Sequence, residues 1–144
     1  MMYPWQQTVW QQATQRWHAL PHAILLSGQQ GTGKMAFAEH LAQALFGEHV
    51  DADKNACGMC SACHLFSQHS HPDCMVMRPE IEEGNARKLQ QIKVDAVREV
   101  LAFAQLSSHQ GGRRVIIIEP AEALNLQAAN ALLKVLEEPP ANVV

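Results

Sequence analysis

Residues 28–35 have the residue types of a phosphate-binding loop in every position but the last. They read Gly-Gln-Gln-Gly-Thr-Gly-Lys-Met, against the pattern G-x-x-x-x-G-K-[ST]. In that pattern the glycines let backbone N–H groups surround phosphates, the lysine reaches the β- and γ-phosphates, and the hydroxyl binds Mg²⁺. Met35 replaces the hydroxyl, and a thioether is a poor ligand for a hard cation. The pattern predicts a degenerate loop in which ATP or ADP binding stays open, at Gly28, Gly31, Gly33 and Lys34.

The strand-like run Val115–Ile118 ends in Glu119-Pro120. In phosphate-loop ATPases such a strand ends in Asp-Glu, which places a metal-linked acid and a water-orienting glutamate beside the γ-phosphate. Glu119 either takes the metal role or is only a solvated strand end, and Pro120 cannot polarise water. Met35 lacks the hydroxyl that would bind Mg²⁺, and Pro120 lacks the carboxylate that would orient water. The sequence therefore predicts no ATP hydrolysis by this chain.

Three cysteines follow one another at two-residue gaps, and a fourth lies further on. This spacing lets thiolates converge on one tetrahedral Zn²⁺, and the alternative is a set of unrelated reduced thiols. A closed site with four ligands would be structural, because no position would be left for chemistry. The predicted ligands are Cys57, Cys60, Cys63 and Cys74, with Glu48, His49, His64 and His71 as rivals for the fourth position.

The elements that must position these residues follow from hydrophobic periodicity. The apolar run 22–27 predicts a buried strand that leads into the loop, and apolar residues at helical spacing predict a helix from Gly33 to Gly47. Further along the chain, the same patterns predict a strand over 74–77, a helix over 94–104, a strand over 115–118, a helix over 126–138 and the start of another strand at 143–144. The order β-α-(insert)-β-α-β-α-(β) indicates an α/β fold with a parallel sheet covered by helices.

Composition limits the classes of function. The chain has 144 residues, 47% of them hydrophobic and 17% charged, and its net charge of −3 gives no overall basic surface for nucleic acid. No apolar run approaches the roughly 20 residues of a membrane span, and the first residues lack the features of a signal peptide. We therefore expect a cytoplasmic protein with no membrane partner, in which cysteines bind metal more readily than they form disulfides.

Several stretches together strongly resemble the bacterial DNA polymerase III clamp-loader family of AAA+ proteins. The stretches are the degenerate loop, the cysteine cluster, Tyr3-Pro4-Trp5, His71-Pro72-Asp73, residues 94–100 and Asn-Ala-Leu-Leu-Lys-Val-Leu-Glu-Glu-Pro-Pro at 130–140. The resemblance implies a three-layer P-loop NTPase (AAA+) domain with a structural zinc module. It also implies a non-hydrolysing scaffold in a hetero-pentamer with gamma/tau and delta subunits, which loads the sliding clamp onto primed DNA as part of a DNA polymerase holoenzyme.

Two other functions remain open from the sequence. One is an active ATPase subunit of the gamma/tau type that tolerates Met35, although that type would keep the hydroxyl and the Asp-Glu pair. The other is a free-standing zinc-binding interaction module. A third class of contact, direct recognition of DNA by this chain alone, has no basic patch to support it.

The chain departs from the family pattern in two respects. The family usually has its first zinc cysteine about nine positions before the C-x-x-C-x-x-C run, within the ligand spacing that zinc sites show; here that region is Phe46-Gly47-Glu48-His49. The Ser-Arg-Cys motif that carries the family's arginine finger does not occur in these 144 residues. We therefore expect residues 1–144 to be the N-terminal part of an AAA+ domain whose sheet stops before its fourth strand is complete, with an inserted zinc module over 47–74.

Overall fold

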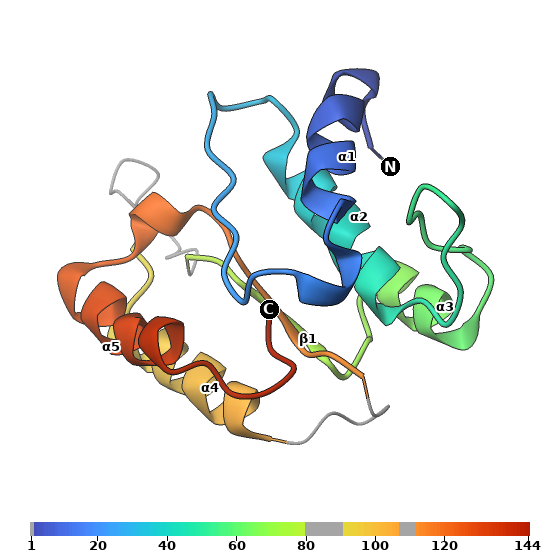
Figure 1. The fold of residues 1–144 in the computed structure, drawn as a ribbon. Helices are drawn as coiled ribbons and strands as arrows, with labels where there is room; N and C mark the ends of the chain where they lie inside the picture. Colours follow the sequence, from blue (N-terminus) through green and yellow to red (C-terminus); the bar gives the residue numbers. More distant parts are fainter. Residues whose placement is uncertain (1, 80–90, 107–111) are drawn as a thin grey trace. The chain divides into compact units, whose positions relative to one another are not determined.

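The computed structural model describes residues 2–79, 91–106 and 112–144. The chain divides into two compact units, Met1–Pro72 and Asp73–Val144, which Figure 1 shows in blue to green and in green to red. Within the described ranges, no helix combines the length and the apolar character that a membrane span requires.

The first unit is helical. Its core consists of Trp10, Phe37, Leu41 and Ala44, with Val50 and other apolar residues packed around them. Trp10 meets the Phe37 ring edge-on at a centroid distance of 5.7 Å. The elements are the 3-10 turns η1 (Pro4–Gln6) and η2 (Trp17–Ala19) and the helices α1 (Gln7–Thr14), α2 (Lys34–Phe46) and α3 (Ser61–Ser67).

The helix predicted between Gly33 and Gly47 is confirmed as α2, but the strand predicted over 22–27 is wrong. Residues 23–27 have neither helical nor strand structure, and Leu25 is 81% exposed. The apolar run is real, but a strand also needs a neighbour that pairs with its N–H and C=O groups. None of the ladders or bridges among the described residues includes this segment.

The second unit contains a parallel sheet backed by helices. Strand β1 (Cys74–Met77) pairs with β2 (Val115–Ile118) in a register that sets Cys74 opposite Val115 and Met77 opposite Ile118. Helices α4 (Val94–Gln105) and α5 (Leu126–Glu137) pack against each other, and α4 also contacts β1. The 3-10 turn η3 spans Ala121–Ala123. These strands and helices confirm the predictions made from their periodicity.

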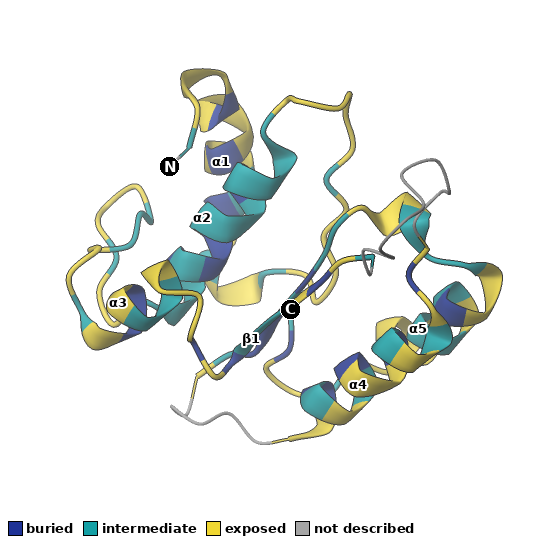
Figure 2. Ribbon diagram, turned by 180° about the vertical axis from the view of Figure 1, so that it is seen from behind, coloured by how far each residue is buried: buried dark blue, intermediate teal, exposed yellow. Residues whose placement is uncertain are grey.

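The core of the second unit consists of residues from the strands and from one face of each helix. Its buried members are Met77, Ile92, Val97, Val100 and Ala128. Buried and exposed positions alternate along α4, whereas α5 has one buried residue, Ala128, among half-buried and exposed positions (Figure 2), and α4 shows the pattern of an amphipathic helix. Asn125 caps α5, because its side-chain oxygen accepts the Ala128 N–H at 2.8 Å.

The last residues add a third segment to the sheet. Val143 forms a parallel bridge with Arg114, and the Ile116 N–H donates to the Val144 carbonyl at 2.9 Å. At the place where the sequence predicts another strand, residues 143–144 thus make one isolated bridge and its hydrogen bonds. The described part of the chain forms a two-stranded sheet extended by this bridge.

A buried ion pair joins the starts of the two strands. The Asp73 carboxylate lies 3.6 Å from the Arg114 guanidinium, and their side chains are only 2% and 3% exposed. The Arg114 guanidinium also donates to the Phe103 carbonyl and lies 4.5 Å from the centre of the Phe103 ring. Since Phe103 belongs to α4, one side chain ties β1, β2 and α4 together.

Candidate metal centre and phosphate loop

In the phosphate loop, the side chain of Lys34 forms hydrogen bonds to backbone carbonyls of the same loop. The Lys34 Nζ donates to the carbonyl oxygens of Gly28 and Gln29 at 2.7 and 2.8 Å. The Thr32 hydroxyl donates to the same Gln29 carbonyl at 2.9 Å. The loop is followed directly by α2, whose second residue is Met35. The cation that a phosphate would need is therefore held by two carbonyls of the loop itself.

The N-terminal segment packs directly on this loop. The Gln6 side-chain amide donates to the Gly33 carbonyl at 2.8 Å and to the Thr32 carbonyl at 3.3 Å. The Tyr3 ring lies against Gly33 so closely that a Cβ there would be 2.6 Å from two ring carbons. Tyr3 in turn stacks on Trp5 at a centroid distance of 4.6 Å. The sequence analysis missed these contacts, because no local pattern links a glutamine and a tyrosine to a loop about 27 residues away.

The acid that ends β2 has a cation for a partner. The Glu119 carboxylate accepts from the Arg78 Nε at 3.1 Å, and the side chains are 42% and 57% exposed. The Glu119 N–H donates to the Met77 carbonyl at 3.0 Å. Of the two roles left open for Glu119, this geometry favours an ion-paired, solvated strand end over a metal ligand.

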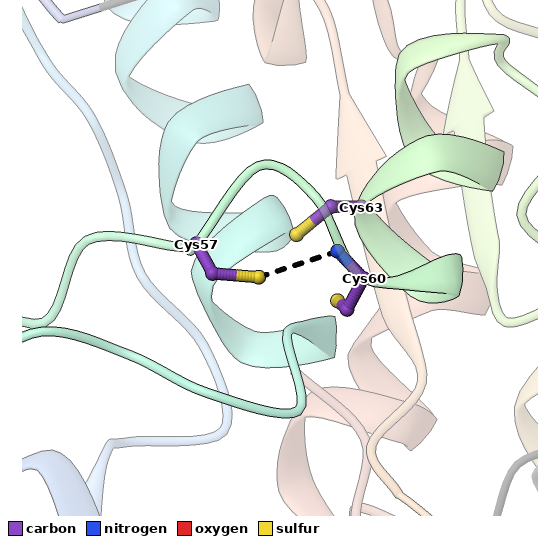
Figure 3. A group of neighbouring side chains, drawn as sticks. All are labelled: Cys57, Cys60 and Cys63. Carbon is purple, nitrogen blue, oxygen red and sulfur yellow. Dashed lines mark hydrogen bonds between the residues drawn. The ribbon is translucent and has the colours of Figure 1, made fainter.

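Three of the four predicted metal ligands come together. The sulfurs of Cys57, Cys60 and Cys63 all lie within 4.8 Å of one another, and Figure 3 shows them around one shared space. Cys57 and Cys60 lie in the loop that leads into α3, and Cys63 lies in the first turn of that helix. Cys57 is exposed, Cys60 is half-buried and Cys63 is buried. A C-x-x-C-x-x-C run that turns into a helix at its second cysteine therefore gathers the three thiols.

Backbone N–H groups point at these sulfurs. The Cys60 N–H lies 3.4 Å from the Cys57 sulfur. The N–H groups of Glu48 and Cys63 bond to the Cys60 sulfur and lower the pKa of that thiol from 9.0 to about 7. Burial and the neighbouring Cys60 raise the pKa of Cys63 to about 11. One thiol of the cluster is thus favoured as a thiolate, which is the form that binds a metal.

A short hairpin fixes the cluster to the helical core. Val50 and Ala56 form an antiparallel bridge, and the Cys57 N–H donates to the His49 carbonyl at 3.2 Å. The Trp10 indole N–H donates to the Asp53 carbonyl at 2.8 Å. Because Val50 and Ala56 also pack on the core around Trp10, the hairpin that leads into the thiol cluster is anchored on that core.

The residues predicted as a possible fourth metal ligand are not grouped with the three clustered thiols. Cys74 lies on β1 in the second unit and is not among the three clustered thiols. His71 is buried and stacks on Phe46 at a centroid distance of 3.9 Å. A His64 ring nitrogen lies 3.2 Å from the Gln68 side-chain amide. Glu48 and His49 are exposed.

A loop with phosphate-loop residues that opens a helix, and a parallel sheet backed by helices, are features of the P-loop class of proteins. The sequence profile of one family matches residues 5–144, and its description is "DNA polymerase III, delta subunit". The chain belongs to this family, which confirms the resemblance to clamp-loader proteins.

Individual relatives agree with the family profile. The chain is 46% identical over 144 residues to the DNA polymerase III subunit delta' of Pseudomonas aeruginosa, a match that covers 99% of this chain and 41% of the relative. Identity to subunit delta' of Haemophilus influenzae is 35%, over 98% of this chain and 41% of that protein. The tau subunit of Bacillus subtilis is 32% identical over 85% of this chain and 20% of its own length.

The chain thus spans about two-fifths of the length of the delta' relatives that it matches. Among solved structures, a gamma subunit-related protein of Thermotoga maritima is similar, at 29% identity and a TM-score of 0.42. That match covers 56% of this chain and 26% of the other.

Proposed function

We propose that this protein is a clamp-loader subunit of delta' type, a scaffold that helps load the sliding clamp onto primed DNA without hydrolysing ATP. The observation that carries the proposal is the 46% identity to a subunit delta' across 99% of the chain. Its partners would be the gamma/tau and delta subunits in a hetero-pentamer, with the clamp and DNA reached through the complex. We also propose that residues 1–144 are the N-terminal part of an AAA+ domain and that the protein is cytoplasmic.

The geometry of the loop supports the absence of hydrolysis. Met35 offers no hydroxyl for Mg²⁺, Lys34 is held by two loop carbonyls, and Glu119 is paired with Arg78. The position after Glu119 is a proline, which cannot orient water. Each part that phosphoryl transfer needs is either missing or engaged elsewhere. Gly28, Gly31, Gly33 and Lys34 then serve to join loop and helix rather than to turn over nucleotide.

ATP turnover by the full-length protein, alone and within the assembled complex, tests this function. We expect no turnover by the protein alone, and we expect the complex to keep its ATPase and clamp-loading rates when it carries Lys34→Met. The corresponding lysine substitution in a gamma/tau subunit is the matched control and should abolish turnover. Turnover by the protein alone that is lost with Lys34→Met would instead identify an active ATPase, and failure to join the complex would favour a free-standing module.

We further propose that the cysteine cluster binds a structural Zn²⁺. The donor set fits this ion, because three sulfurs share one space and backbone N–H groups already point at two of them, those of Cys57 and Cys60. When bound, zinc would cross-link the hairpin to α3. Cys57, Cys60 and Cys63 would hold it, and the sequence alone gives Cys74 as the natural fourth ligand. Metal analysis of the purified full-length protein should find about one zinc per chain if a single tetrahedral site is present.

A further inference from the structure

Residues 3–6, the N-terminal segment, hold the phosphate loop by hydrogen bonds and by a ring contact. We propose that this segment keeps phosphate groups out of the loop, because it stabilises the conformation in which Lys34 is bound to loop carbonyls. Release of the segment would then open the loop to a polyphosphate. The inference goes beyond the proposed scaffold function, since it assigns a role to the N-terminal segment and states how the loop is controlled.

The closed conformation of the loop is defined by Lys34. A bound polyphosphate would need the lysine ammonium together with the N–H groups of the loop. In the structure the ammonium donates to the carbonyls of Gly28 and Gln29 at 2.7 and 2.8 Å, and a phosphate must compete with these bonds. The apparent affinity of a site falls with the fraction of molecules that are competent to bind. Contacts that stabilise the closed conformation therefore weaken phosphate binding.

Thr32 connects the N-terminal segment to this lysine. The Thr32 carbonyl accepts from the Gln6 amide at 3.3 Å and lies 3.4 Å from the Trp5 indole nitrogen. The Thr32 hydroxyl donates at 2.9 Å to the Gln29 carbonyl, which also accepts from Lys34. Because the segment holds Thr32 in place, it also stabilises the carbonyl to which the lysine is bound.

Gly33, which directly precedes Lys34, is the second point of attachment. The Gln6 amide donates to the Gly33 carbonyl at 2.8 Å, and the Tyr3 ring occupies the space where a Gly33 side chain would lie. The amide oxygen of Gln6 accepts the Tyr3 N–H at 3.1 Å. Gln6 is only 8% exposed, whereas glutamine is usually found at the surface. One end of this buried amide is thus bonded to the segment and the other end to the loop.

Binding of inorganic tripolyphosphate to the full-length protein, measured by calorimetry without Mg²⁺, tests the proposal. This probe has no base or sugar, so it reports on the phosphate-binding part of the loop. Gln6→Ala should raise the affinity by about 2- to 10-fold for each hydrogen bond lost, the factor that one such bond contributes to an equilibrium. Tyr3→Ala, at a residue that is 43% exposed, should also raise it. Gln7→Ala is the matched control, because Gln7 is the exposed neighbour of Gln6.

The reactivity of Lys34 gives a second measurement that needs no ligand. An amine-reactive reagent followed by mass spectrometry reports how firmly the lysine ammonium is held. Gln6→Ala and Tyr3→Ala should both react faster at Lys34 than the parent protein does. Lys134, an exposed residue of α5, serves as the internal reference in every sample.

The affinity gained by Gln6→Ala should be lost again when Lys34→Met is added. If neither Gln6→Ala nor Tyr3→Ala exceeds the parent protein in tripolyphosphate affinity and in Lys34 reactivity, the proposal is overturned, because the segment then supports the loop without closing it. A gain that survives Lys34→Met also overturns it, since the phosphate then binds outside the loop. The proposed scaffold function fails by different results, namely ATP turnover or failure to join the complex.

Discussion

At the scale of single residues, Gly33 is subject to two separate constraints. Its φ of 81° lies in the left-handed region, and the Tyr3 ring occupies the space that a side chain would need. Gly31 has a similar φ of 84°, but no atom lies within 4 Å of the place where its Cβ would be. Comparing the two glycines therefore distinguishes the cost of the left-handed backbone, which both share, from the cost of steric contact, which only Gly33 has.

Alanine substitutions at these two glycines should differ in their cost. Gly31→Ala should lower the free energy of unfolding by about 1–2 kcal/mol, the cost of a left-handed alanine. Gly33→Ala should cost more, because the Tyr3 ring must also move. Urea denaturation of the full-length variants measures both costs. Adding Tyr3→Ala to Gly33→Ala should remove the excess, and equal costs for the two single variants would show that the Tyr3 contact carries no weight.

At the scale of elements, the buried ion pair between Asp73 and Arg114 joins the residues that directly precede β1 and β2. Removing one partner of a buried ion pair leaves the other charge without compensation, which costs about 3–5 kcal/mol. We therefore expect Arg114→Met to lower the free energy of unfolding by an amount of this size in urea denaturation.

Arg98→Met is the matched control, because Arg98 pairs with Asp95 at 3.2 Å with side chains that are 71% and 83% exposed. An exposed pair of this kind contributes less than about 1 kcal/mol. Similar losses for the two variants would mean that Arg114 holds no strand or helix in place.

Elements were predictable from sequence where the signal is local. Helices α2, α4 and α5 follow from apolar spacing, and β2 follows from a run of β-branched residues. The strand expected over 22–27 failed because pairing is not local: the apolar run specifies burial, and only a neighbouring segment can make it a strand.

The same distinction holds for the sites. The thiol cluster was predictable because three cysteines lie within seven residues, so a turn and the start of a helix suffice to gather their sulfurs. The Arg78–Glu119 pair joins residues 41 positions apart, and the contact between Gln6 and Gly33 spans 27. Only the folded chain brings such residues together, and their types alone carry no sign of it.

At the scale of the whole molecule, the division into two units predicts where loss of the proposed zinc would be felt. The clustered thiols and the hairpin that supports them belong to Met1–Pro72, whereas the sheet belongs to Asp73–Val144. Removal of zinc by a chelator should therefore speed amide hydrogen exchange over residues 48–67 and leave the amides of β1 and β2 unchanged, because local opening follows cooperative units. Uniform acceleration across both units would contradict this.

The contact between the N-terminal segment and the phosphate loop has an optical consequence. The Trp5 indole N–H lies 3.4 Å from the Thr32 carbonyl, and Trp5 is 65% exposed, whereas Trp10 is 2% exposed in the core. A water-soluble quencher such as iodide would therefore reach Trp5 and spare Trp10. Trp5 is thus a natural fluorophore in contact with the loop, and loss of its contact with Thr32 should change the quenchable part of the emission without an added label.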